Sequence, residues 1–181
     1  MSPYLKGDPM SANIELLYIA SLGKQHHVED LGKKKFQKLV YLIETVAHID
    51  LGYSYQIHLY GPFSKALDDD LRELSSIKQV DYTRSNQSFL LGVTAEGAKE
   101  LHEADGRIRN QQTIDNVFTQ FCSRSPRDLE LLTTSCFVCN KLGSDATRDE
   151  LKSCVQRIKG SKFKSSLIEE SIDEALALTT A

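Results

Sequence analysis

The stretch that most constrains the fold runs from Tyr60 to Leu74, YGPFSKALDDDLREL, and continues into a hairpin pattern. Gly61-Pro62 predicts a turn, Ser64 is a favoured helix N-cap, and leucines then recur at helical spacing. The residues QVDYTRSNQSFLLGVT give two strand-like runs around turn-forming residues, and Thr94 caps the helix that follows. A helix, a hairpin and a second helix in this order predict a winged helix-turn-helix domain, because a hairpin can cover the open side of three short helices.

Helices are predicted on both sides of this segment. Ser11 caps a first helix that ends at Gly23, and KKKFQKLVYLIETVAHID carries an apolar stripe at helical spacing. YSYQIHLY alternates aromatic and β-branched residues, which predicts a short strand. Later helices begin with capping patterns at Ser125-Pro126, at Thr147 with Glu150 and at Ser166 with Glu169. The predicted fold class is α+β, mostly α, with a winged helix-turn-helix domain followed by a helical C-terminal extension.

The length of 181 residues suits one domain with an appendage. We expect residues 1–11 to be a flexible lead-in and residues 12–105 to form the winged-helix domain. Residues 106–181 form a helical C-terminal unit packed on the first, and the loop GRIRNQQ at 106–112 is the predicted seam.

The charge of the chain argues against simple phosphate binding. The formal net charge is −3, and residues 61–105 hold five basic and nine acidic side chains, a net charge of −4. A protein that binds nucleic acid through phosphates alone is strongly basic. The one concentrated basic segment is KSCVQRIKGSKFK, residues 152–164, whose ordinary interpretation is a solvated surface. No apolar run is long enough to cross a bilayer, and the polar N-terminus does not resemble a signal peptide, so a cytoplasmic location without membrane contact is expected.

The four cysteines include a C-x-x-C pair, as many zinc sites do, but this pair lies in a predicted helix. They are Cys122, Cys136, Cys139 and Cys154. The pair Cys136 and Cys139 falls within a predicted helix, whereas a structural zinc site takes such a pair from a tight turn. We interpret the four residues as buried thiols in a reducing compartment and predict no metal site.

Enzyme motifs are missing from the sequence. It contains no G-x-S-x-G, P-loop, G-x-G-x-x-G or H-E-x-x-H pattern. His26-His27 has no ligand at metal-binding spacing, and His58 is interpreted as a strand histidine. We therefore predict a protein that is not an enzyme and uses no cofactor.

Several motifs carry a resemblance to a known family. The helix KKKFQKLVYLIE, the turn YGPFS and the downstream segments DLELLTTSCFVCNKLG and KFKSSLIEESIDEAL resemble the YwgA-like family over residues 33–178. A more distant similarity is to the Panacea-type, SocA-like antitoxin domain, which has its own lysine-led helix and Y-G-P turn. The resemblance implies a regulatory role, with toxin neutralisation and phage-related loci as its context.

The predicted recognition helix has the wrong charge for a DNA groove. Its polar residues are Lys65, Asp68, Asp69, Asp70, Arg72 and Glu73. Pairs at i,i+4 neutralise part of this charge, and carboxylates are repelled by phosphate. Our first hypothesis is an adaptor or antitoxin-like regulator that presents this acidic helix to a protein partner, such as a basic toxin or nuclease.

The second hypothesis is a transcriptional regulator that binds double-stranded DNA. Its contacts would come from the lysine-led helix and the hairpin tip, through Lys34, Lys38, Tyr41, Arg84, Asn86 and Gln87. A solvated helix face is the ordinary interpretation of such a lysine stripe. A homodimer formed by the C-terminal helices would suit this hypothesis, because paired half-sites compensate for weak single contacts.

Overall fold

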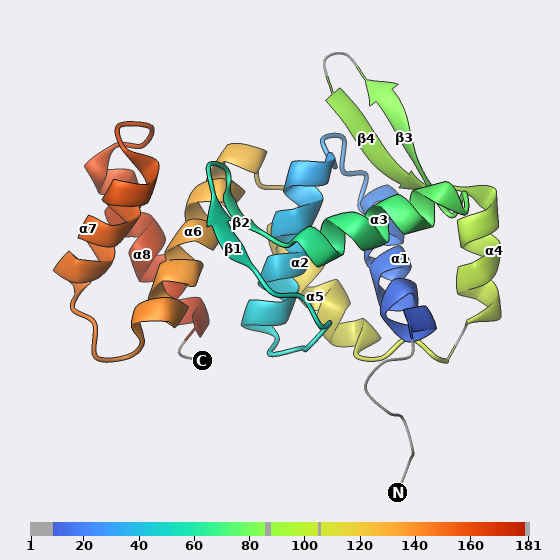
Figure 1. Ribbon diagram of the computed structural model, residues 1–181, viewed down its shortest axis with the longest axis horizontal. Helices are drawn as coiled ribbons and strands as arrows, with labels where there is room; N and C mark the ends of the chain where they lie inside the picture. The colour runs from blue at the N-terminus through green and yellow to red at the C-terminus, as the bar shows by residue number, and fades with distance from the viewer. Residues whose placement is uncertain (1–8, 86–87, 105, 180–181) are drawn as a thin grey trace, which may run out of the picture.

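The computed structural model describes residues 9–85, 88–104 and 106–179 and shows a mostly helical α+β protein with two small hairpins (Figure 1). The helices of these residues are α1 (Pro9–Gln25), α2 (Lys33–Val46), α3 (Lys65–Ser76), α4 (Ala95–Glu103), α5 (Gln111–Phe121), α6 (Pro126–Leu142), α7 (Arg148–Lys159) and α8 (Ser165–Thr179). The strands are β1 (Gln56–His58), β2 (Gly61–Phe63), β3 (Val80–Ser85) and β4 (Ser88–Val93). In the described part of the chain, no helix is long and apolar enough to span a membrane.

The predicted order of helix, hairpin and helix after Ser64 is confirmed. Leu67, Leu71 and Leu74 of α3 are fully buried, as their spacing predicts. Strands β3 and β4 pair antiparallel from Val80 opposite Val93 to Ser85 opposite Ser88. This hairpin stands out from the helices beside α3 (Figure 1). Its base is tied to the helical body, because the Leu91 N–H donates to the Leu31 carbonyl ahead of α2.

Local capping explains where four of these helices begin. The hydroxyls of Ser64, Thr94 and Ser125 accept hydrogen bonds from the first turns of α3, α4 and α6. Thr147 and Glu150 form the predicted capping box of α7. The start predicted for the last helix is wrong by two residues: a cap at Ser166 places the first helical residue at Leu167, whereas α8 begins at Ser165.

The predicted limits of the first helix are also wrong. Helix α1 begins at Pro9, ahead of Ser11, and continues past Gly23 to Gln25. A Cβ atom on Gly23 would lie 2.2 Å from a methyl carbon of Leu31. The role of Gly23 is therefore to allow a close approach to Leu31. From its position in the sequence alone, this glycine had indicated the end of the helix.

The strand predicted over Tyr53–Tyr60 is shorter than expected. Only Gln56–His58 is a strand, and it pairs antiparallel with Gly61–Phe63. The Gly61-Pro62 dipeptide is therefore part of a second small hairpin. Gly61 has φ 96°, and its Cα faces the Glu130 carbonyl and the hydroxyls of Thr133 and Thr134 in α6, so a side chain there would be strained and crowded.

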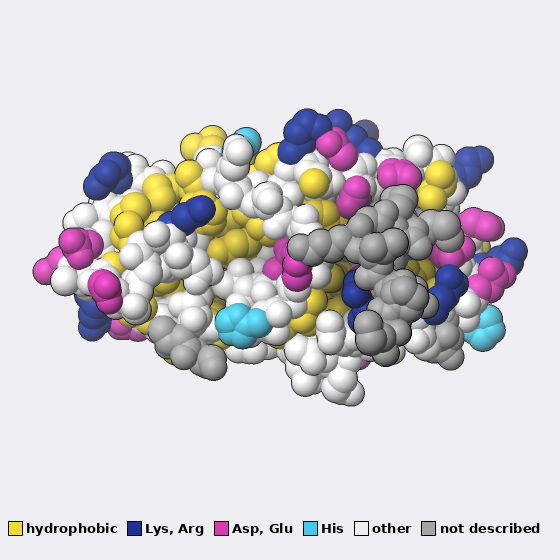
Figure 2. Space-filling model, turned by 60° about the horizontal axis from the view of Figure 1, so that its bottom comes forward, with side chains coloured by type: hydrophobic (Ala, Val, Ile, Leu, Met, Phe, Trp, Pro, Cys, Tyr) yellow, Lys and Arg dark blue, Asp and Glu magenta, His cyan; other side chains and the backbone are white. Residues whose placement is uncertain are grey.

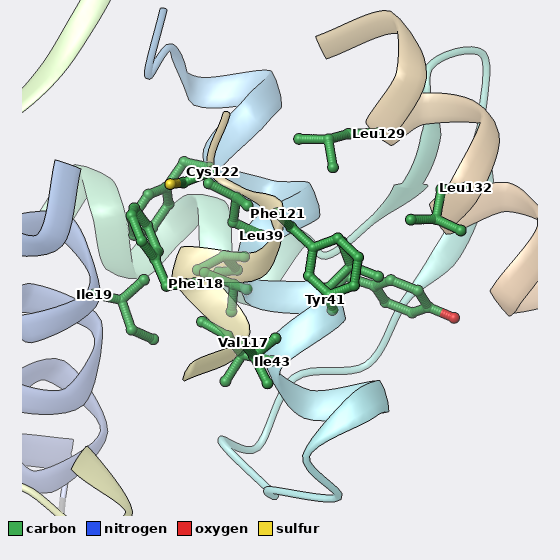
Figure 3. Packing of buried hydrophobic residues seen from close by; sticks show 14 of the residues in the cluster. Ile19, Leu39, Tyr41, Ile43, Val117, Phe118, Phe121, Cys122, Leu129 and Leu132 are labelled. Carbon is green, nitrogen blue, oxygen red and sulfur yellow. The ribbon is translucent and has the colours of Figure 1, made fainter. Parts of the chain in front are cut away.

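Helix α2 lies at the centre of the molecule, with α6, α7 and α8 at one end and α1, α3, α4 and β3–β4 at the other (Figure 1). Figure 3 shows Leu39, Tyr41 and Ile43 of α2 among Val117, Phe118 and Phe121 of α5 and Leu129 and Leu132 of α6. The buried residues form one cluster that runs from Ile14 to Ala175. The core therefore continues across the predicted seam at 106–112.

Candidate functional site

The acidic helix α3 buries one of its three aspartates. Asp68 is 5% exposed and lies between Lys33 of α2 and Arg72 of the next turn of α3. The Arg72 guanidinium is 2.8 Å from the Asp68 carboxylate. Two cations on one buried carboxylate make Asp68 a structural link between α2 and α3, so it is not available to a partner.

The other charged residues of α3 include two exposed carboxylates. Lys65 is 2.5 Å from Asp69, and this hydrogen bond lowers the Asp69 pKa. Asp70 is half-buried and accepts a 2.9 Å hydrogen bond from the Tyr53 hydroxyl. Glu73 is exposed and has no ion-pair partner among the residues that the structure describes. Asp69 and Glu73 are thus the acidic groups that α3 presents to solvent.

The face of the molecule in Figure 2 mixes the two signs of charge. Lys and Arg side chains lie next to Asp and Glu along its edge, while hydrophobic side chains gather over the half that contains α6–α8. A mixed rim of this kind does not create the single-sign field that attracts a phosphate backbone.

Among the described residues predicted to contact DNA, two are exposed and two are buried. Lys34 and Arg84 are exposed, but Lys38 is 3% and Tyr41 5% exposed. Asn86 and Gln87 lie outside the described residues. The stripe predicted on α2 is interrupted because α2 is packed against neighbours on nearly all sides, including α5, α6 and β2. A phosphate could reach Lys34 and Arg84 from solvent, whereas Tyr41 is part of the core (Figure 3).

The turn at Tyr60 brings together lysines that are distant in the sequence. The Lys34 ammonium lies 3.6 Å from the centre of the Tyr60 ring, and the Lys162 ammonium lies 5.1 Å from it. Such cation–π contacts favour a cation over the ring face. Lys159, at the end of α7, donates a 3.2 Å hydrogen bond to the Leu59 carbonyl in the same turn. Two of the segments that carry the resemblance, the lysine-led helix and YGPFS, therefore meet here.

One carboxylate lies within this group of lysines. Glu130 of α6 is buried and accepts hydrogen bonds from Lys159 at 2.9 Å and from Lys162 at 2.8 and 2.7 Å. Burial alone would raise the Glu130 pKa, but the hydrogen bonds from Lys162 and Lys159 outweigh it, and the pKa is lowered. Glu130 is therefore ionised near neutral pH and both of its oxygens are occupied.

Lys38 is the buried lysine without such a partner. No carboxylate among the described residues lies within ion-pair distance of its ammonium. Burial lowers the Lys38 pKa to about 8. Glu130 opposes this shift, and Lys159, Lys34 and Lys162 add to it. We call Lys34, Lys38, Lys159 and Lys162, with Glu130 and Tyr60, the lysine cluster.

Sequence reasoning missed most of this cluster. Lys159 and Lys162 belong to the basic segment 152–164, which we interpreted as a solvated surface, yet Lys159 is buried. The available signal was Glu130, a single carboxylate within the run LELLTTSC. A buried acid needs cations near it, but the sequence alone does not say which ones.

A shallow recess beside the core has a structural explanation. It is lined by Tyr41, Glu44, Thr45, His48, Ile49, Asp50, Tyr53 and Tyr55. Glu44 accepts hydrogen bonds from the Leu51 N–H at 2.9 Å and the Tyr55 hydroxyl at 2.7 Å. Both of its oxygens are thus used to hold the loop after α2.

The cysteines are placed as thiols inside or beside the helices. Cys122, Cys136 and Cys139 are buried, Cys154 is partly buried, and all four are free. Burial raises the Cys136 pKa to about 12, which keeps this thiol protonated near neutral pH. Among the residues that the structure describes, no three His, Cys, Asp or Glu side chains are grouped to hold a metal ion.

Comparison with known proteins gives one informative relative. The chain is 28% identical over 153 residues to the uncharacterized protein YwgA of Bacillus subtilis, and the match covers 82% of this chain and 84% of the relative. This similarity confirms the expected resemblance to the YwgA-like family. It gives no support to the more distant resemblance to the Panacea-type domain. No protein-family model matches the chain.

Proposed function

We propose that this YwgA-like chain is a non-enzymatic regulatory module. In this proposal, residues 12–105 form a winged-helix domain that binds a protein partner through the exposed face of α3. An adaptor or antitoxin-like role, with a basic toxin or nuclease as the partner, follows from that mode of binding. The observation that carries the proposal is the pairing of the cations on α3.

The arrangement of the first three helices supports the winged-helix assignment. Helices α1, α2 and α3 enclose a shared core, and β3–β4 follows α3 directly, as a wing follows a recognition helix. The hydrogen bond from Leu91 to Leu31 adds a short third strand-like contact to the wing. The α2–α3 connection, residues 47–64, is longer than the usual turn of three or four residues and contains β1–β2.

The cations of α3 are already engaged by carboxylates. Lys65 pairs with Asp69, and Arg72 lies 2.8 Å from Asp68 and 4.0 Å from Asp69. A duplex would have to break these pairs and approach Asp69 and Glu73, which repel phosphate. A protein surface can instead meet the exposed carboxylates with Lys or Arg side chains of its own.

Exposed apolar side chains at the end of α3 and on β4 also favour a protein. Ile77 at the end of α3 is 51% exposed, and Phe89 of β4 is 60% exposed. Burying these side chains would stabilise a complex with a protein, because association is favoured by removing apolar surface from water. A phosphate backbone offers little apolar surface in return.

The direct test reverses the exposed charge of α3. The variant Asp69→Lys with Glu73→Lys should lose the proteins that the wild-type chain captures from its source cells. It should keep the wild-type melting temperature to within a few degrees, because both side chains are exposed. The matched control is Glu103→Lys with Glu170→Lys, which makes the same charge change on α4 and α8. Equal capture by wild type and both variants would remove the α3 face from the proposal.

A second candidate function is binding of double-stranded DNA. It is favoured by Lys34 and Arg84, which are exposed and have no carboxylate partner in the described parts of the chain. Arg84 lies on the wing, where a minor-groove contact would be made. The charge of α3 makes this the weaker candidate.

A further inference from the structure

The lysine cluster contains more positive charge than its own residues neutralise. Lys159 and Lys162 share the single carboxylate of Glu130 and occupy both of its oxygens. Lys34 is held over the Tyr60 ring. The charges of Glu130, Lys159, Lys34 and Lys162 all act on Lys38. Two ammonium groups, those of Lys159 and Lys162, therefore bind the one carboxylate, while Lys34 lies over the neighbouring Tyr60 ring and Lys38 is coupled to Glu130 only electrostatically.

Lys38 is the member that a purely structural cluster does not explain. Its side chain is almost completely buried, yet no described carboxylate pairs with it. An ammonium at the end of a mostly buried side chain is costly unless it is paired or bound to a ligand. An apolar residue of the same length would fill the position at lower cost, so the structure itself does not require a lysine there.

The geometry points to a binding site for the phosphate group of a small phosphorylated ligand. We propose that Lys34 and Lys162, which are exposed, form its entrance beside Tyr60, and that the buried Lys38 forms its floor. A phosphate dianion would supply the negative charge that the cluster lacks and would accept several N–H hydrogen bonds at once. This proposal is independent of the protein-binding face on α3.

Thermal unfolding of the whole protein tests this proposal. The chain is melted near pH 7 in increasing sodium phosphate, in increasing adenosine 5′-monophosphate, and in sodium chloride at matched ionic strength. A ligand that binds only the folded state raises the melting temperature in a saturable way. We expect phosphate or the nucleotide to do so and chloride to have a much smaller effect. The ligand that acts at the lower concentration shows whether the site prefers free phosphate or a phosphate monoester.

Two variants connect the effect to the cluster. Without phosphate, Lys38→Met should keep or raise the melting temperature. In the phosphate titration, its apparent affinity for phosphate should be at least tenfold weaker than that of the wild type. Lys34→Ala changes an exposed side chain, so it should fold normally and still show a weaker response. The control Lys99→Met removes an exposed lysine of α4 that is 3.9 Å from Glu103, and it should leave the response unchanged.

Three results would overturn the proposal. The first is the lack of a saturable response in the wild type beyond that given by chloride. The second is a phosphate response in Lys38→Met and in Lys34→Ala that is as strong as the response of the wild type. The third is a Lys38-dependent response to a DNA duplex without any response to the small ligands, which would assign the cluster to nucleic acid instead.

Discussion

Glu130 and Lys38 illustrate opposite ways of burying a charge. Glu130 is surrounded by ammonium groups that donate to both of its oxygens, and its pKa is lowered in spite of burial. The charge of the same carboxylate acts on Lys38 without an ion pair to any described residue, and burial lowers the Lys38 pKa. Removing one partner of the first arrangement would leave a buried charge unpaired, while the second arrangement costs stability unless a ligand binds.

Removing the Glu130 carboxylate should be strongly destabilising. In Glu130→Gln the buried Lys159 would lose its charged partner, and breaking a buried pair in this way costs about 3 kcal/mol or more. Urea unfolding of the two proteins measures the difference. The control is Asp173→Asn, which breaks the exposed pair with Arg148 and should cost less than about 1 kcal/mol. Similar losses in both variants would contradict the special role of Glu130.

The effect of Lys38→Met on stability should depend on pH. The Lys38 pKa is about 8 in the folded chain, below the usual value of 10.5, so the unfolded chain binds more protons between these values. Wild-type stability therefore rises with pH in this window relative to Lys38→Met, by about 2 kcal/mol between pH 7 and pH 9.5. Urea unfolding at both pH values measures the change. A difference that is independent of pH would mean that Lys38 is not buried as a cation.

Single residues were predictable from sequence where a local pattern decides their place. Ser64, Thr94 and the leucines of α3 are examples, because capping and helical spacing act within one turn. Lys38 and Tyr41 were expected on an exposed face, since a lysine on a helix is usually solvated. Their burial results from the packing of α6 and β2 on α2, which is set by residues far along the chain.

At the scale of secondary-structure elements, the connection between α2 and α3 depends on Gln37. This buried side chain accepts a 3.1 Å hydrogen bond from the Ser64 N–H and donates a 2.9 Å hydrogen bond to the Ser64 carbonyl. Ser64 in turn caps α3 through the Leu67 N–H. The pair fixes the start of α3, and the end of β1–β2, against α2.

Replacing Gln37 should loosen this connection. In Gln37→Leu the buried N–H and carbonyl of Ser64 would lose their partners, which costs about 2 kcal/mol or more. Urea unfolding measures the loss, and amide exchange at Leu67 and its neighbours should become faster. The control Gln120→Leu changes an exposed residue of α5 and should stay within about 0.5 kcal/mol of wild type. A neutral Gln37→Leu would show that other contacts fix α3.

The elements that the sequence did not predict are those that depend on distant contacts. The β1–β2 hairpin includes Gly61-Pro62, which read alone indicates only a turn. Its position depends on α6 and on the hydrogen bond from Lys159 to Leu59. The hairpin β3–β4 was predictable because its two strands and its turn are adjacent in the sequence.

At the scale of the whole molecule, α2 joins the two predicted units. Its side chains pack with those of α5 and α6, which lie after the seam at 106–112 (Figure 3). The N-terminal unit alone would therefore expose Leu39, Ile43 and the rest of that face of α2 to water. The expected units 12–105 and 106–181 follow one another in the sequence, but their buried residues belong to one core.

This shared core predicts cooperative unfolding. The full chain should show coincident thermal transitions by circular dichroism and by tyrosine fluorescence, as a two-state unit does. A fragment of residues 12–105 should lack a sharp transition and should expose apolar surface, because the contacts of α2 with α5 and α6 are missing. A fragment that melts sharply by itself would contradict a shared core.

Fluorescence anisotropy of a labelled random DNA duplex, titrated with the whole protein at two salt concentrations, decides between a protein and a duplex as the partner of α3. We expect no duplex binding of the kind that weakens steeply with salt, since the cations of α3 are paired with Asp68 and Asp69. Binding that weakens steeply with salt and is lost in Lys34→Ala with Arg84→Ala would contradict it. The chain would then be a DNA-binding protein whose α3 face is not the site of contact.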